Sequence, residues 1–207
     1  MPSPFSKEIG DEWDRLISRP DRTLEDGRQP HPEEIAGSKA LYAKAIEDGK
    51  WQVSVADASL VASLGVSIAF QEYRYADAVD LARQFLNHPG LEHSDPVYSK
   101  EHFLSALGLN LMLIGRIEEG LAEFERMLTK LPGPLSHRRR LVRNQLIILA
   151  EEGDAEAAPD LKVVAFASQL LSNMPGQKRK SAKILDAKSN QEFIDILEST
   201  FAPRKSI

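Results

Sequence analysis

The stretch from His102 to Pro132, HFLSALGLNLMLIGRIEEGLAEFERMLTKLP, decides the fold of this chain. Its first half repeats leucine or isoleucine at spacings of three and four residues, which is the period of one face of an α-helix. These positions are Leu104, Leu107, Leu111 and Ile114. Gly115 ends this run, a second run of the same period extends from Ile117 to Leu131, and Pro132 stops it. Because the turn between the runs is short, the sequence predicts two antiparallel helices.

The same stretch resembles a tetratricopeptide repeat, a helix–turn–helix unit of about 34 residues with the pattern W-x₂-L-G-x₂-Y…A-x₃-F…P. Here the pattern runs Leu104-x₂-Leu107-Gly108-x₂-Leu111, then Gly120-x₃-Phe124, then Pro132. The spacing fits throughout, although Leu104, Leu111 and Gly120 replace the aromatic residue, the tyrosine and the alanine. An ordinary helical hairpin of another all-α fold is the alternative, and the spacing favours the repeat.

A weaker copy of the hairpin precedes this one, over residues 54–88. Its turn, YRYADA at 73–78, matches GRIEEG at 115–120, which lies 42 residues later. Tyr73 stands where the second copy has the turn glycine, and Ala82 stands where the repeat pattern expects phenylalanine. A period of 42 residues also fits other helical repeats.

Further helices are expected on both sides of these two hairpins. Ser136 is a suitable N-cap for a helix of about 136–152, and a helix of about 157–173 would complete a third hairpin. We therefore predict three regions: residues 1–31, a short helix and linker; 32–176, the helical repeat domain; and 177–207, a capping helix. The resemblance implies an all-α fold of antiparallel hairpins stacked as a tetratricopeptide-like right-handed superhelix, with capping helices.

Composition limits the location and the chemistry. The 207 residues include no cysteine, which excludes disulfides and thiolate metal sites, and the net charge of −5 disfavours general binding to nucleic acid. The polar N-terminus does not have the pattern of a signal peptide, and no apolar run is long enough to predict a membrane span. We expect a cytoplasmic protein without a membrane partner. No feature indicates an oligomeric state.

Candidate chemical groups are few. His88, His93 and His102, with Asp95, are metal-ligand types, but their spacings match no dedicated motif and most lie in a proline-containing loop. The sequence has no phosphate-binding loop, dinucleotide motif or nucleophile elbow. We therefore expect no metal, no cofactor and no catalysis.

The densest charge feature is the basic run HRRRLVRN at 137–144, followed by a second at 177–180. Phosphate contacts to RNA are one possible role. Against it, no aromatic residues alternate with the arginines to stack bases. Arginines at the start of a helix oppose its dipole, which favours some use for them. Arg140, Arg143 and Asn144 would share one face of that helix and favour an acidic segment of a protein partner.

The family resemblance also implies a binding surface, since the first helix of each tetratricopeptide pair lines a concave surface that commonly holds a peptide or partner domain. The corresponding positions are Leu60, Ser63, Ser67 and Phe70, then His102, Ser105, Leu109 and Met112. Most are apolar, which argues against the family's clamp for chaperone carboxyl termini. We predict a non-catalytic protein-interaction module. The alternatives are an immunity or inhibitor protein that binds a cognate toxin or enzyme, and an RNA-associated repeat protein.

Overall fold

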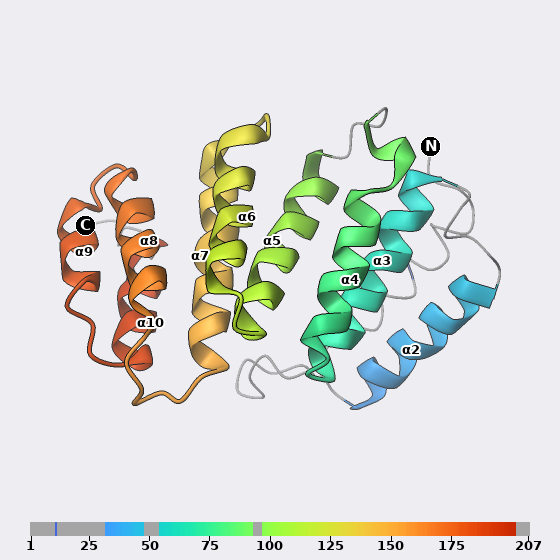
Figure 1. Ribbon diagram of the computed structural model, residues 1–207, viewed down its shortest axis with the longest axis horizontal. Coiled ribbons are helices and arrows are strands. Elements are labelled where there is room, and N and C mark those ends of the chain that lie inside the picture. Colours follow the sequence, from blue (N-terminus) through green and yellow to red (C-terminus); the bar gives the residue numbers. More distant parts are fainter. Residues whose placement is uncertain (1–10, 12–31, 48–53, 93–96, 202–207) are drawn as a thin grey trace. The chain divides into compact units, whose positions relative to one another are not determined.

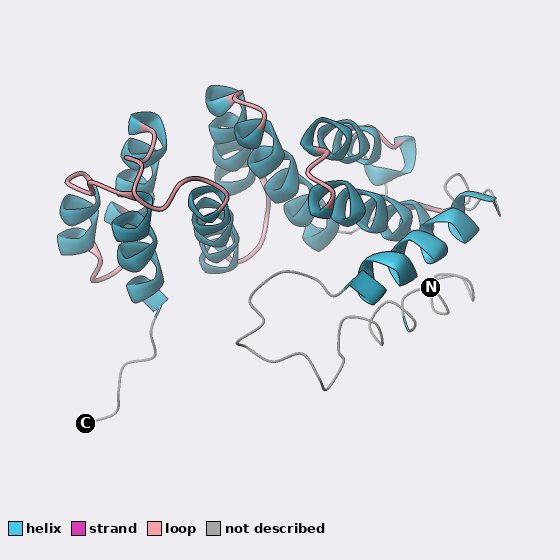
Figure 2. Cartoon of the chain, turned by 90° about the horizontal axis from the view of Figure 1, so that it is seen from below, coloured by secondary structure: helices cyan, strands magenta, loops and turns pink. Residues whose placement is uncertain are grey.

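The computed structural model describes residue 11 and residues 32–47, 54–92 and 97–201, and every regular element in these ranges is helical (Figures 1 and 2). The predicted all-α class is therefore confirmed. Apart from Asp11, which is helical, the predicted N-terminal region, residues 1–31, lies outside the described residues. The chain divides into two compact units, Met1–Asn110 and Leu111–Ile207, and the division falls within one helix.

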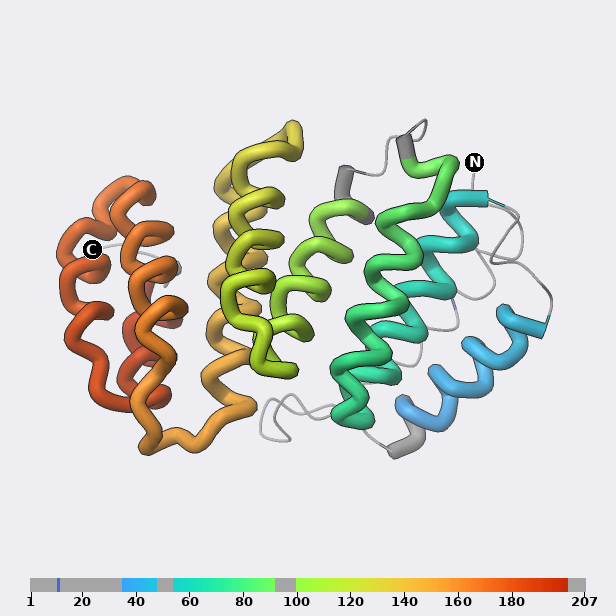
Figure 3. The backbone as a smooth tube through the Cα atoms, in the orientation of Figure 1, coloured from blue at the N-terminus to red at the C-terminus, as the bar shows by residue number. Residues whose placement is uncertain are grey.

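The first unit is built around two antiparallel helices, α3 (Val55–Gln71) and α4 (Tyr75–Leu86), which lie side by side (Figure 3). α2 (Pro32–Glu47) packs on α3, and its Tyr42 ring comes so close that a Cβ on Gly65 would lie 2.9 Å from it. A short 3-10 helix, η3 (Pro89–Glu92), follows α4, and the unit includes most of α5 (Val97–Leu113). Phe85 and Phe103 join α4 to α5, with ring centroids 4.2 Å apart.

The second unit holds five further α-helices among the described residues. They are α6 (Ile117–Lys130), α7 (Leu135–Glu151), α8 (Leu161–Ser172), α9 (Lys178–Ile184) and α10 (Asn190–Glu198), followed by the 3-10 turn η4 (Ser199–Phe201). α6 packs on α7 and α8, and α9 joins α8 to α10. Phe124 and Phe193 are fully buried, as the periodicity predicts for Phe124.

The turn between α3 and α4 repeats the turn between α5 and α6 in backbone geometry. Tyr73 and Gly115 both adopt the left-handed conformation, at φ 59° and 83°. The next residue, Arg74 or Arg116, donates its backbone N–H to the carbonyl five positions earlier, which is the Schellman closure of a helix. Each of these arginines also pairs with the acidic residue three positions later, Asp77 or Glu119. The predicted correspondence between these two turns is therefore confirmed.

The predicted third hairpin is only partly correct. α7 begins after Pro134, which is its N-cap residue, so Ser136 lies inside the first turn and does not cap it. α8 begins at Leu161 because the Asp160 carboxylate accepts the backbone N–H groups of Lys162 and Val163. An exposed loop of 152–160 separates the two helices, and the main partner of α7 within this unit is α10 rather than α8.

The two turns offer a matched test of left-handed strain. A side chain at φ > 0 costs about 1–2 kcal/mol, and a Cβ on Gly115 would meet no atom within 4 Å. We therefore expect Gly115→Ala to lower the free energy of unfolding by about 1 kcal/mol. Tyr73→Gly should raise it by about 0.5–1 kcal/mol, because glycine removes the left-handed strain but also increases the entropy of the unfolded chain. Denaturant unfolding measures both changes. A Gly115→Ala protein as stable as the parent would contradict this geometry.

Candidate functional site

The junction between α6 and α7 is held by a buried arginine. Helix α6 ends at Lys130, and the segment Pro132-Gly133-Pro134 that follows supplies only one backbone N–H. The last carbonyls of α6 therefore lack local donors. Arg138, which is 5% exposed, supplies them. Its Nη1 lies 2.8, 3.1 and 2.5 Å from the carbonyl oxygens of Met127, Leu128 and Leu131, and its Nη2 donates to that of Gly133 at 2.9 Å.

This contact fixes the start of α7 against the end of α6. A cation there also complements the negative end of the α6 dipole. Since successive residues of a helix point about 100° apart, the side chains next to Arg138 must leave in other directions. Arg140 is exposed and bonds to the His137 ring, with 3.1 Å between Nη2 and Nδ1. Arg139 is half-buried and lines a groove between α6, α7 and α8.

The groove has a volume of about 200 Å³. Its apolar lining residues, which we name the apolar floor, are Leu128, Leu135, Phe166 and Leu170. Residues from all three helices line it: Glu125, Leu128 and Thr129 of α6, Leu135 and Arg139 of α7, and Phe166, Gln169, Leu170 and the following Asn173 of α8. The Phe166 ring lies 6.2 Å from that of Phe124, which anchors the floor in the core. Leu135 is 37% exposed although it is a large apolar residue. The groove is therefore open to solvent over an apolar surface.

Four polar side chains at the groove are not used by the fold. They are Glu125, Arg139, Gln169 and Asn173, and within the described residues none of them makes a side-chain hydrogen bond or ion pair. Thr129 differs, because its hydroxyl donates to the Glu125 carbonyl at 2.8 Å. An apolar floor with a few convergent polar groups is the usual character of a binding site.

A second depression, of about 150 Å³, lies at the opposite ends of these helices and is lined by residues including Ile117, Leu149 and Phe193. Its polar groups serve the fold. Asp160 caps α8, and the Asn190 side chain donates to the Asp154 carbonyl at 2.8 Å while its backbone N–H donates to that of Ala157 at 2.8 Å. These bonds pin the loop 152–160, so we assign this depression a structural role.

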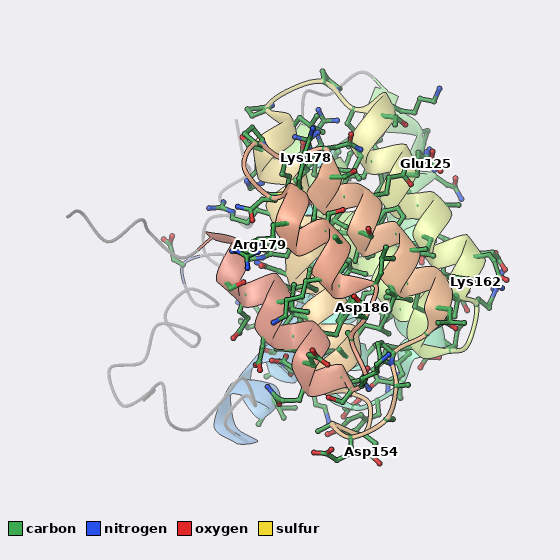
Figure 4. All side chains as sticks on the ribbon, turned by 90° about the vertical axis from the view of Figure 1, so that its left-hand side faces the viewer. Glu125, Asp154, Lys162, Lys178, Arg179 and Asp186 are labelled. Atoms are coloured by element: carbon green, nitrogen blue, oxygen red, sulfur yellow. The ribbon has the colours of Figure 1, made fainter. Side chains whose placement is uncertain are left out.

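Charge is unevenly distributed along the second unit. At the end that holds the groove, where α6 and α8 finish and α7 and α9 begin, the exposed or half-buried cations are Arg126, Lys130, Arg139, Arg140, Lys178, Arg179 and Lys180. At the other end, the exposed acids are Glu118, Glu119, Glu151, Glu152, Asp154, Glu156 and Asp160. Lys178 and Asp154 lie towards opposite ends of the unit in Figure 4. The exposed acids Glu125 and Glu198 also lie at the end that holds the groove, so this end is a basic region in which cations outnumber exposed acids.

The acidic end carries an ion pair that joins two helices. Lys162 of α8 pairs with Glu118 of α6, and the hydrogen bond from Lys162 holds the pKa of the Glu118 carboxyl below its ordinary value. The same bond raises the pKa of Lys162. In the first unit, hydrogen bonds from Lys39 and then Arg74 lower the pKa of Glu72. These shifts favour the charged forms, so the side chains stay charged near neutral pH. We therefore assign these ion pairs a structural role.

The predicted binding residues of α3 belong to the first unit and are half-buried. Leu60, Ser63, Ser67 and Phe70 each retain some exposure. The Ser67 hydroxyl accepts a hydrogen bond from Gln71 Nε2 at 3.4 Å, and the Phe70 ring lies 5.6 Å from that of Tyr75. Their role in binding stays a prediction.

The predicted positions on α5 are mostly covered. His102 is exposed, but Ser105, Leu109 and Met112 are only 1%, 3% and 3% exposed, so the expectation that they form an open surface is wrong. The reason lies in the composition of this helix, which is apolar on more than one face and is therefore covered on more than one side.

Of the three residues predicted to share a basic face of α7, Arg140, Arg143 and Asn144, only the last two contact each other. Arg143 donates to the Asn144 side-chain oxygen from Nε at 3.2 Å and from Nη2 at 2.7 Å. Arg140 instead turns to His137, and none of the three residues lines the groove. The groove and the buried Arg138 were not anticipated. The donor-poor Pro-Gly-Pro segment followed by an arginine run is the sequence feature that indicates the Arg138 contact.

The histidines show no metal-binding arrangement within the described residues, where no group of three or more histidine or carboxylate side chains is placed to hold a metal ion. His88 has a local structural role, because its Nδ1 accepts the backbone N–H of Gly90 at 3.1 Å. His93 and Asp95 lie outside the residues that the structure describes.

Comparison of the chain with protein-family models, with curated proteins and with solved structures finds no match. Among the helices that the structure describes, none combines the length and apolar character needed to cross a membrane.

Arg138 and Arg140 provide a matched test of the junction. Arg138→Met would remove the donor from the buried Met127 carbonyl and from three partly buried carbonyls, and one buried unsatisfied group costs about 1–3 kcal/mol. We expect the free energy of unfolding to fall by about 2–4 kcal/mol for Arg138→Met. The exposed control Arg140→Met should change it by less than about 0.5 kcal/mol. Equal stability of the two variants in denaturant unfolding would show that Arg138 does not hold this junction.

Proposed function

We propose that this chain is a non-catalytic protein-interaction module built from tetratricopeptide-like hairpins. The observation that carries the proposal is the groove between α6, α7 and α8, which combines an apolar floor with four polar side chains that the fold leaves unused. Glu125, Gln169 and Asn173 are exposed and Arg139 is half-buried, so these groups are accessible to a ligand beside exposed apolar surface, which favours a binding role.

The size of the groove supports a protein rather than a small-molecule ligand. Pockets for small molecules are usually about 300–1,000 Å³, whereas this groove offers about 200 Å³. That space suits one large side chain of a partner, with the rest of the partner lying on the surrounding surface. Binding of this kind depends on a few well-placed anchors.

The repeated turn supports the proposed family type. Tyr73 and Gly115 close successive hairpins with the same hydrogen bonds, and the motif positions Leu104, Leu107 and Phe124 are buried. A right-handed superhelix formed by such hairpins belongs to the proposal, and so does a partner recognised by more than one of them.

RNA association is a second candidate function, favoured by the basic region around the groove. Phosphates would bind the cations there, and the affinity would fall steeply with added salt. An inhibitor or immunity role would be a special case of the first candidate, in which the partner is one folded protein.

The two candidates are separated by isolating the tagged full chain from its native host with and without nuclease treatment. The proposal predicts a protein that stays bound in a fixed molar ratio after nuclease digestion and size-exclusion chromatography, because protein contacts do not depend on nucleic acid. Light scattering and mass spectrometry measure the ratio and identify the component. If nucleic acid is the bound component and every protein leaves after digestion, the interaction function is wrong.

A further inference from the structure

We propose that the groove between α6, α7 and α8 binds a partner segment that carries one large apolar side chain next to an acidic one, with the acid held by Arg139. The inference rests on the proposed interaction function and adds the location and the chemistry of recognition. It also moves the recognition site from Arg140, Arg143 and Asn144 to Arg139, the residue of the arginine run that lines the groove.

The floor of the groove determines the apolar anchor. Leu128 and Phe166 are half-buried and Leu135 is 37% exposed, so the groove presents apolar area from three helices. Leu170 also lines the groove and is only 5% exposed. Removing such surface from water contributes about 25 cal/mol per Å², and a leucine-sized or aromatic side chain would cover it.

The charge of Arg139 determines the residue that lies next to the apolar anchor in the partner segment. The Arg139 guanidinium lines the groove and, among the described residues, has no carboxylate partner of its own. A guanidinium offers donors in a rigid fork that matches the two oxygens of a carboxylate. The cations Arg126, Lys130 and Lys178 belong to the same end of the unit, so its potential also favours an acidic segment.

The other polar groups orient the segment. Glu125 comes from α6 whereas Arg139 comes from α7, so an acid of the partner is drawn to the α7 side and repelled from the α6 side. Gln169 and the adjoining Asn173 offer amide donors and acceptors on the α8 side, which suit the backbone of an extended segment. Recognition therefore has a direction as well as a composition.

Neighbouring arginines fit this role less well. Arg140 bonds to His137 and Arg143 bonds to Asn144, and neither lines the groove. Single-stranded RNA also fits less well, because base stacking needs exposed aromatic faces and the one aromatic ring lining the groove, Phe166, is half-buried.

The test uses the full chain as bait for a phage-displayed random dodecapeptide library. Enriched peptides are then synthesised with a fluorophore, and their affinity is measured by fluorescence anisotropy. We expect the enriched sequences to share a large apolar residue with Asp or Glu beside it. Arg139→Gln should weaken binding roughly tenfold or more, whereas the matched control Arg140→Gln should change it by less than about twofold.

A double-mutant cycle connects the peptide acid to Arg139. Replacing the acid by its amide should weaken binding to the parent protein but have little further effect on Arg139→Gln. Leu135→Ser, at an exposed first-turn position, tests the apolar floor separately and should also weaken binding. Circular dichroism and unfolding compare each variant with the parent, and Leu135→Ser decides the test if Arg139→Gln is destabilised.

The contradicting results distinguish two failures. Enriched peptides that lack an acid, or that bind the Arg139→Gln and Leu135→Ser proteins as well as the parent, would overturn the groove assignment while the interaction function stands. No enriched peptide, together with binding of labelled oligouridine that Arg139→Gln abolishes, would overturn both and indicate a phosphate site. No enriched peptide and no oligouridine binding would also reject the groove as a segment-binding site.

Discussion

The arrangement of the second unit depends on one buried guanidinium. α6 ends before a Pro-Gly-Pro segment that cannot satisfy its terminal carbonyls, and Arg138 reaches back from α7 to four carbonyl oxygens between Met127 and Gly133. A buried charge is costly unless it is hydrogen-bonded, so the bonds from Nη1 and Nη2 favour one geometry for the junction. The groove lies beside that junction, and its α7 wall is positioned by it.

Three consecutive arginines therefore have three different environments. Arg138 is buried in the fold, Arg139 lines the groove and Arg140 is exposed beside His137. The cause is helix geometry, since each residue turns the side chain by about 100°. A run of like charges that opposes the helix dipole is thus explained partly by structure and partly by the proposed recognition of an acidic segment. Only the second explanation depends on a partner.

The sequence predicted those features that follow from local periodicity. The leucines of 104–111, the burial of Phe124 and the equivalence of the turns at Tyr73 and Gly115 all come from residue type and spacing. Features that depend on tertiary contacts were missed: the burial of Ser105 and Met112, the pairing of α7 with α10, and the groove itself. A helix that is apolar on several faces does not show which face is covered, and the letters of an arginine run do not show which guanidinium is buried.

The most direct test of this account is nuclear magnetic resonance of the arginine side chains in the full ¹⁵N-labelled chain. A guanidinium that donates to several carbonyls rotates slowly about its Nε–Cζ bond and exchanges its hydrogens slowly with water, whereas exposed groups do neither. We predict one arginine with resolved, slowly exchanging Nη hydrogens, and we expect its signals to disappear in Arg138→Lys. If every arginine exchanges rapidly, or if the protected signals persist in Arg138→Lys, Arg138 is not buried at this junction and the groove is not built as described.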